Sequence, residues 1–423
     1  MPPRAEPYDL VIVGLGLAGL VAGLAAAGRG ARTLLVGKGH GTLRFRSGTL
    51  DVLGYWAERL VSSPAATLAA IVSERPHHPY ALAGEDLEPA LQEVCRAAAA
   101  SGLELGGGLE ANQLVATAAG TLRPTCLAPP TMRVRWEGAR VLVVGLAGYR
   151  DFQADLPASV LPAAAASVGL EVEARPVTVD LPSLHRRHLS GVELARLFDQ
   201  AAFRSELLGA LRGVLKDASL VAFPAVIGLD AARDAAAELA LQLGVPVVEL
   251  PTLPPSVPGL RLELALTAAL RRAGARLQVG TWARAMADGE RIGWLELESP
   301  GHKLRVKVDR VLLASGGLAS GGLEVGLDGS LRETVADLPV WLPEPSRAAL
   351  VGRSFLEPGG HPLGQAGLVV DERMRPLDRE GRPVHENLFA AGGLLAHADR
   401  AVEKSADGIC CATAWRAALA ATT

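Results

Sequence analysis

The feature that most constrains the fold of this chain is a glycine-rich segment near its start, VIVGLGLAGLVAGLAAAGRGARTLLVGKG at residues 11–39. The apolar pattern predicts a strand at residues 8–13, a turn and helix at residues 15–28, and a second strand at residues 31–36. This order is the βαβ unit of nucleotide-binding α/β folds, in which the ligand lies at the glycine turn. We therefore expect a parallel sheet with a nucleotide site at the end of its first strand.

Each glycine of this turn has a distinct expected role. Gly14 permits the tight turn, Gly16 lets the backbone approach a phosphate, and Gly19 lets helix and strand pack closely. The N–H groups of Leu17 and Ala18 begin the helix, where free donors and the positive dipole end favour a phosphate. These five residues are therefore candidate cofactor contacts, and a glycine-rich packing turn without a ligand is the alternative.

The end of the second strand lacks the acidic residue that usually binds the adenosine ribose. That residue is expected about 20 positions after the turn, where this chain has Val36-Gly37-Lys38. Gly37 has no side chain to bind a ribose diol, whereas Lys38 could neutralise a phosphate. The pattern favours FMN over FAD or NAD, although backbone groups can also hold an adenine.

The same segment contains an unbroken apolar run of 18 residues, 11–28, with a GxxxG motif at Gly19 and Gly23. Its length alone would allow a membrane helix. Five glycines fall within the run, and each costs up to about 1 kcal/mol inside a helix. The strand, turn and helix interpretation is therefore favoured, and we expect no membrane span.

Composition excludes several other classes of function. The 423 residues include 42 basic and 45 acidic side chains without long runs of one sign, so nucleic-acid binding is not expected. The cysteines, at positions 95, 126, 410 and 411, lack the spacing of a zinc or iron–sulfur site, so no metal site is expected. No apolar signal segment precedes Tyr8, which favours a reducing cytosol.

Three later segments contain small residues suited to a flavin crevice. They are RFRSGTLDVLG at 44–54, VDRVLLASGGLASGG at 308–322, and ENLFAAGGLLAHADRAVEKSADGIC at 386–410. Small residues after a strand are typical of a ligand crevice, and the helix that begins near residue 407 is expected to direct its N-terminus at the flavin ring. Their candidate cofactor contacts are Ser47, Gly48, Thr49, Ser315, Gly316, Gly392, Gly393, Gly408 and Ile409.

The order of these segments, together with several more particular motifs, resembles a known family. The motifs are HPYALAG at 78–84, GTLRPTCL at 120–127, GYRDFQA at 148–154, FPAVIGL at 223–229 and LPTLPPSVPGLRL at 250–262. With them the chain resembles, nearly end to end, the B subunit of the anaerobic glycerol-3-phosphate dehydrogenase. This is a flavoprotein family of the FAD/NAD(P)-binding Rossmann-like superfamily.

The resemblance implies an FMN-binding partner of an FAD-containing A subunit and a membrane-anchoring iron–sulfur C subunit. Such a complex oxidises sn-glycerol 3-phosphate to dihydroxyacetone phosphate and passes electrons to a quinone, for fumarate or nitrate respiration. It also implies a cytoplasmic chain that is peripheral to the inner face of the cell membrane through its partners. An electron-transfer role is expected to dominate.

For the fold we predict an α/β architecture, with a three-layer Rossmann-like flavin domain assembled from residues 1–60, 256–335 and 350–423. Residues 61–255 are predicted to form an inserted α/β domain. Within it, ARVLVVGLAGYRDFQA at 139–154 has a second glycine turn, with Gly145 and Gly148. A βα turn in a packing domain is favoured there over a second nucleotide site, because the third glycine is missing.

The sequence does not identify a single catalytic residue. Oxidation of a secondary alcohol that carries a phosphate needs a base and cations, and the weak candidates are His397, Arg400 and Lys404. Two alternative functions remain open. One is a self-sufficient FAD-dependent dehydrogenase of a small hydroxy compound, and the other is a structural or assembly subunit without a working cofactor.

Overall fold

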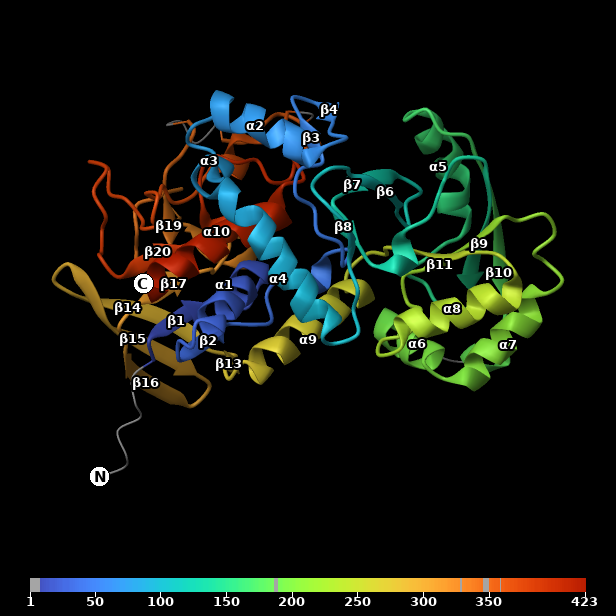
Figure 1. Cartoon of the computed structure of the whole chain (residues 1–423), viewed down its shortest axis with the longest axis horizontal. Coiled ribbons are helices and arrows are strands. Elements are labelled where there is room, and N and C mark those ends of the chain that lie inside the picture. Colours follow the sequence, from blue (N-terminus) through green and yellow to red (C-terminus); the bar gives the residue numbers. More distant parts are fainter. Residues whose placement is uncertain (1–7, 186–188, 328, 345–349, 358) are drawn as a thin grey trace. The chain divides into compact units, whose positions relative to one another are not determined.

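The structure is a computed structural model that describes residues 8–185, 189–327, 329–344, 350–357 and 359–423. The chain divides into two units (Figure 1). The first comprises Met1–Thr42, Asp51–Ser101 and Ala265–Thr423, and the second comprises Leu43–Leu50 and Gly102–Leu264. Each unit has its own parallel sheet.

The first unit is built on a five-stranded sheet with the order β13-β2-β1-β17-β20, and all its neighbouring strands are parallel. Every residue of β1, β2, β17 and β20 is buried, as expected for a parallel sheet covered on both faces. The strands are β1 (Leu10–Val13), β2 (Thr33–Gly37), β13 (Arg276–Val279), β17 (Val311–Leu313) and β20 (Leu388–Ala390).

Three helices of this unit pack on one another. Helix α1 (Leu17–Gly28) packs against α10 (Ala406–Thr422), which also packs against α4 (Leu87–Ala99) (Figure 1). The expectation for the apolar run 11–28 is confirmed, because β1 and α1 share it. Among the described residues, no helix is long and apolar enough to cross a membrane.

Smaller elements complete the first unit. An antiparallel sheet has the order β14-β15-β16, and two-stranded ribbons pair β3 with β4 and β18 with β19. These elements are β3 (Tyr55–Trp56), β4 (Arg59–Leu60), α2 (Pro64–Glu74), α3 (Pro79–Ala83), β14 (Trp282–Asp288), β15 (Arg291–Ser299), β16 (His302–Lys307), β18 (Leu323–Val325) and β19 (Leu331–Glu333).

The second unit has a four-stranded parallel sheet with the order β10-β9-β11-β12. Its apolar core is formed by these strands and helices α5 to α8. Its elements are β5 (Gly106–Gly107), β6 (Gln113–Ala116), β7 (Leu122–Thr125), β8 (Leu127–Ala128), β9 (Ala139–Leu146), α5 (Asp155–Ala166), β10 (Val172–Val179), α6 (Gly191–Phe198), α7 (Ala201–Leu211), β11 (Leu220–Pro224), α8 (Ala232–Leu243) and β12 (Val247–Leu250). Helix α9 (Val257–Arg272) carries the chain back into the first unit.

The α/β class with parallel sheets is confirmed, but the unit boundaries differ from the predicted domain boundaries. Residues 61–101, predicted as part of the insert, belong to the first unit, where α4 packs on α10. Residues 43–50 and 256–264, predicted as part of the flavin domain, belong to the second unit, where Leu50 pairs with Leu127. Tertiary packing decides these assignments.

Candidate functional site

The glycine turn after β1 brings three pieces of backbone into contact. Gly14 has a φ of +129°, and a Cβ there would lie 2.1 Å from the carbonyl oxygen of Ala314. A Cβ on Gly19 would lie 1.9 Å from the carbonyl oxygen of Gly14. Only glycine allows this approach, so the first and third glycines are required by the packing of β1, α1 and the segment after β17.

Gly16 differs from Gly14 and Gly19, because among the described residues there is open space around the position that a Cβ would take. It is the N-cap of α1, and the N–H groups of Leu17, Ala18 and Gly19 find no acceptor among the described residues. These three residues are buried. Buried N–H groups at a helix start require an acceptor, and a phosphate oxygen there also meets the positive end of the helix dipole.

The segment after β17 adds a second unsatisfied polar group. Ser315 follows this strand, and its Oγ is buried without a hydrogen-bond partner in the part of the chain that the structure describes. The turn is tight, because a Cβ on Gly322 would lie 1.8 Å from the carbonyl oxygen of Gly316. A Cβ on Gly317 would lie 2.8 Å from the carbonyl oxygen of Gly393, so the segments after β17 and β20 meet here.

Gly392 brings the segment after β20 against α1. It has a φ of +73°, its N–H donates to Thr413 Oγ1 at 2.9 Å, and a Cβ there would lie 2.7 Å from the Cβ of Ala18. Strands β1, β17 and β20 are parallel neighbours, so the turns that follow them all lie at the C-terminal ends of the strands. The structure thus brings together Gly14, Gly16, Leu17, Ala18, Gly19, Ser315, Gly316, Gly392 and Gly393, which we call the glycine cluster.

The glycine cluster fits the phosphate end of a flavin. It combines open space at Gly16 with the N–H groups at the start of α1 and the hydroxyl of Ser315, which have no hydrogen-bond partner within the described ranges. A ligand with oxygen atoms on this surface would satisfy these groups, which otherwise cost free energy because they are buried away from water.

At the end of β2 the chain has Gly37 where a ribose-binding carboxylate is expected. Gly37 is buried, and a Cβ there would lie 3.0 Å from Leu15 Cγ, so an added side chain would require a small shift of Leu15. Lys38 is exposed, and its Nζ donates to the carbonyl oxygen of Gly321 at 3.2 Å. The ammonium group therefore lies beside the segment that follows β17.

Two candidates on α10 do not offer the donors expected of them. The N–H groups of Asp407 and Gly408 donate to the carbonyl oxygen of Asp51 at 3.2 and 3.1 Å, and that of Ile409 donates to Ser405 at 3.0 Å. A Cβ on Gly408 would lie 2.1 Å from Tyr80 Oη. The glycine therefore serves packing, and the expectation that these N–H groups face a flavin ring is not met.

Ser47, Gly48 and Thr49 belong to the second unit, and contacts within that unit hold them. Ser47 Oγ lies 2.7 Å from Thr49 Oγ1 and accepts a hydrogen bond from Arg123 at 3.1 Å. A Cβ on Gly48 would lie 2.5 Å from the Cβ of Pro258. These contacts account for the small residues locally, and a role in cofactor binding stays a prediction.

His397 lies among aromatic rings and has an unusual backbone conformation. Its φ is +69°, and its ring centroid is 4.0 Å from that of Trp341 and 5.5 Å from that of His77. Burial, followed by the neighbouring His77 and His78, lowers the pKa of His397 to about 4. The imidazole is therefore neutral at pH 7, so it does not supply positive charge for a phosphate.

This low pKa predicts a specific dependence of stability on pH. The folded pKa of His397 is about 4 and the reference value is 6.5, so the unfolded state binds more protons within that window. We expect the free energy of unfolding to fall by about 1–2 kcal/mol as pH drops from 6.5 to 4, after allowance for partial exposure. His397→Gln should flatten this part of the stability curve, measured by urea unfolding across pH.

The matched control is His302→Gln, which removes an exposed histidine from β16. This variant should keep the pH dependence of the wild-type chain. An unchanged slope in His397→Gln would show that another group titrates in this range.

Of the three weak catalytic candidates, Arg400 has its guanidinium group beside the turn after β17. One terminal guanidinium nitrogen is 3.6 Å from the Cβ position of Gly317, and the other donates to the carbonyl oxygen of Leu395 at 2.8 Å. Lys404 Nζ lies 5.6 Å from the ring centroid of Tyr55. Arg400 can therefore present positive charge to the turn after β17.

A buried pair of polar side chains, His78 and Glu403, lies in the first unit and was not predicted from the sequence. His78 Nδ1 accepts from the N–H of Tyr80 at 3.2 Å, so its Nε2 carries the proton toward Glu403 Oε2, also at 3.2 Å. Ser405 Oγ donates to the same carboxylate oxygen at 2.7 Å. His78 and Glu403 are 325 positions apart, and no local pattern connects them.

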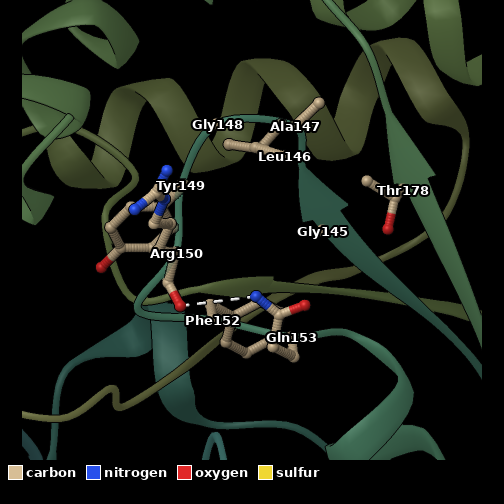
Figure 2. Close-up of a pocket in the computed structure, with 9 residues that line it drawn as sticks. All are labelled: Gly145, Leu146, Ala147, Gly148, Tyr149, Arg150, Phe152, Gln153 and Thr178. Atoms are coloured by element: carbon tan, nitrogen blue, oxygen red, sulfur yellow. Dashed lines mark hydrogen bonds between the residues drawn. The ribbon is translucent and has the colours of Figure 1, made fainter. Parts of the chain in front are cut away.

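The second glycine turn, after β9, lines a cavity of about 330 Å³ (Figure 2). A Cβ on Gly145 would lie 3.1 Å from Thr178 Oγ1 and 3.2 Å from the Cβ of Ala154, so this glycine lets β9 pack against β10 and the start of α5. Asp155 occupies the first turn of α5, where it opposes an anion. These contacts favour the interpretation as a βα packing turn.

Comparisons with known proteins agree with this geometry. The model of the FAD binding domain family matches residues 9–409. The probable B subunit of an anaerobic glycerol-3-phosphate dehydrogenase from Halobacterium salinarum is 33% identical over 98% of this chain and 97% of its own length. The B subunit of the anaerobic glycerol-3-phosphate dehydrogenase of Pectobacterium atrosepticum is 33% identical over 95% of each chain.

A solved structure, the 3-ketosteroid delta1-dehydrogenase of Sterolibacterium denitrificans, covers 99% of this chain with 13% identity and a TM-score of 0.44. That similarity is too weak to add to the assignment. The match over most of the chain and the near full-length relatives decide it. The chain belongs to the FAD binding domain family and, within it, to the family formed by the B subunits of anaerobic glycerol-3-phosphate dehydrogenases.

Proposed function

We propose that this chain is a flavin-binding subunit of an anaerobic glycerol-3-phosphate dehydrogenase. The observation that carries the flavin assignment is the set of buried N–H groups at the start of α1, which have no acceptor among the described residues and lie beside the open space at Gly16. The substrate assignment follows from the names of its full-length relatives. The proposed reaction converts sn-glycerol 3-phosphate to dihydroxyacetone phosphate.

The residues of the glycine cluster would hold the cofactor by its phosphate. Leu17, Ala18 and Gly19 offer N–H donors, and Ser315 offers a hydroxyl. A bound flavin would accept a hydride equivalent from a carbinol carbon and pass the electrons onward. Arg400 would place positive charge beside the turn after β17, and the neutral His397 could accept a proton but could not bind a phosphate by charge.

FMN is the form of the flavin that we propose, with FAD as the alternative. The family name favours FAD, but Gly37 supplies no side chain in place of the acidic residue that commonly holds the adenosine ribose. The purified complex should release FMN in addition to the FAD of the A subunit, as measured by the masses of the released cofactors. Release of FAD alone would contradict this part of the proposal, and an absence of flavin absorbance after reconstitution would contradict the flavin assignment itself.

The proposed partners are an FAD-containing A subunit and an iron–sulfur C subunit. The chain would attach to the inner face of the membrane through these partners and pass electrons toward a quinone. We expect negligible oxidation of glycerol 3-phosphate by this chain alone with an artificial electron acceptor, and turnover once the A subunit is added. Rapid turnover without a partner would instead support a self-sufficient dehydrogenase of a small hydroxy compound.

A further inference from the structure

A basic pocket of about 350 Å³ lies in the first unit, and Arg291, Arg310, Arg373 and Arg375 line it together with Glu386 and Asn387. Arg310 directly precedes β17, and Asn387 directly precedes β20. The glycine cluster follows the same two strands. The basic pocket and the glycine cluster therefore lie at opposite ends of the strands of this sheet. The basic pocket is therefore distinct from the proposed flavin site.

A buried amide joins the segments that carry two of these arginines. Asn387 is 3% exposed, and its Nδ2 donates to the carbonyl oxygens of Ile292 at 2.9 Å and Asp309 at 2.8 Å. Its Oδ1 accepts from the N–H of Ile292 at 2.8 Å. Ile292 and Asp309 are the neighbours in sequence of Arg291 and Arg310, so this amide fixes the backbone that positions both guanidinium groups.

The carboxylate of Asp371 holds the turn that carries the other two arginines, Arg373 and Arg375. Asp371 Oδ1 accepts from the N–H groups of Arg373 and Arg375 at 2.9 and 2.8 Å, and Asp371 Oδ2 accepts from Arg375 Nε at 2.8 Å. The side chain of Arg373 is not used by these contacts. The turn is therefore organised without its guanidinium group.

The basic pocket holds more positive charge than its acidic groups balance. Arg375 is paired with Asp371, and Arg291 lies 3.4 Å from Glu386 in an exposed pair. Hydrogen bonds from Arg32, which is paired with Asp9, lower the pKa of that carboxyl most, and Arg310 adds only a small contribution. Within the described parts of the chain, neither Arg310 nor Arg373 forms an ion pair with a carboxylate.

We propose that the basic pocket binds a small oxyanion that carries at least two negative charges, as phosphate esters and polycarboxylates do. Guanidinium groups match such anions through paired, charge-assisted hydrogen bonds. Asn387 and Asp371 hold the backbone that carries the arginines before an anion binds, so fewer groups have to be ordered on binding. The volume of the basic pocket suits a small molecule.

The test is calorimetric titration of the full chain with pyrophosphate and, separately, with citrate, in buffer of about 50 mM salt where screening is modest. FMN is added in excess, so that the glycine cluster is occupied if it binds flavin. We expect Arg310→Gln and Arg373→Gln each to weaken binding of the anion about tenfold, as loss of a charge-assisted hydrogen bond would. Tighter binding of one probe assigns the ligand to phosphates or to carboxylates.

The control variant is Arg271→Gln, which removes an exposed arginine at the end of α9 and should change the affinity less than twofold. Melting temperatures close to that of the wild-type chain would show that the variants fold. The proposal is overturned if neither anion binds the wild-type chain, if Arg271→Gln weakens binding as much as the pocket variants, or if both pocket variants bind like the wild-type chain.

Discussion

Gly14→Ala is expected to destabilise the first unit by about 3–5 kcal/mol and to abolish flavin retention. The added Cβ would lie 2.1 Å from the carbonyl oxygen of Ala314, and both are backbone-anchored, so neither can move without shifting β1 or β17. A φ of +129° is also strained for alanine. Thermal unfolding of the purified chain, together with hydrogen exchange in β1 and β17, would measure the loss.

Gly16→Ala is the matched control, because it adds the same methyl group two residues away. No atom of the described residues other than its own chain neighbours lies within 4 Å of its Cβ position, and its φ is −77°. Stability should change by no more than about 1 kcal/mol, the size of an N-cap effect. Flavin affinity should nevertheless fall about tenfold, because the methyl group enters the space beside the unpaired donors. Equal destabilisation by the two variants would refute this account of the turn.

Glu249→Ala is expected to destabilise the second unit by about 3–5 kcal/mol, because it leaves a buried arginine without its counter-ion. Arg261 is 4% exposed and Glu249 is fully buried, and two guanidinium nitrogens contact the carboxylate at 2.8 and 2.9 Å. The carboxylate also accepts from Thr131 Oγ1 at 2.6 Å and from the N–H of Ile227 at 2.8 Å. The loss would be measured by urea unfolding followed through Trp136, which lies in the core of this unit.

Glu296→Ala is the control for charge removal as such. Its pair with Arg305 spans 2.8 Å, but the two side chains are 39% and 70% exposed. Exposed pairs contribute at most about 1 kcal/mol, so this variant should unfold close to the wild-type chain. A loss below about 1 kcal/mol in Glu249→Ala would show that the second unit tolerates an unpaired Arg261.

Part of the site could be predicted because its residues follow strands of one sheet. The turns at Gly14, Ser315 and Gly392 each come after a short apolar run, and parallel strands end at a common edge. Whether the N–H groups at the start of α10 are available to a ligand could not be predicted from the order of strands and turns. The carbonyl oxygen that occupies them belongs to Asp51, more than 350 positions away.

The sequence by itself determined the βαβ start, the glycine turn and the α/β class, because strand and helix periodicity and the steric needs of glycine act over a few residues. Only the tertiary structure decided that residues 61–101 join the first unit and residues 43–50 the second. It alone paired His78 with Glu403 and gathered the four arginines of the basic pocket. Long-range packing chooses such partners from the shape and charge of surfaces that form only when the chain is folded.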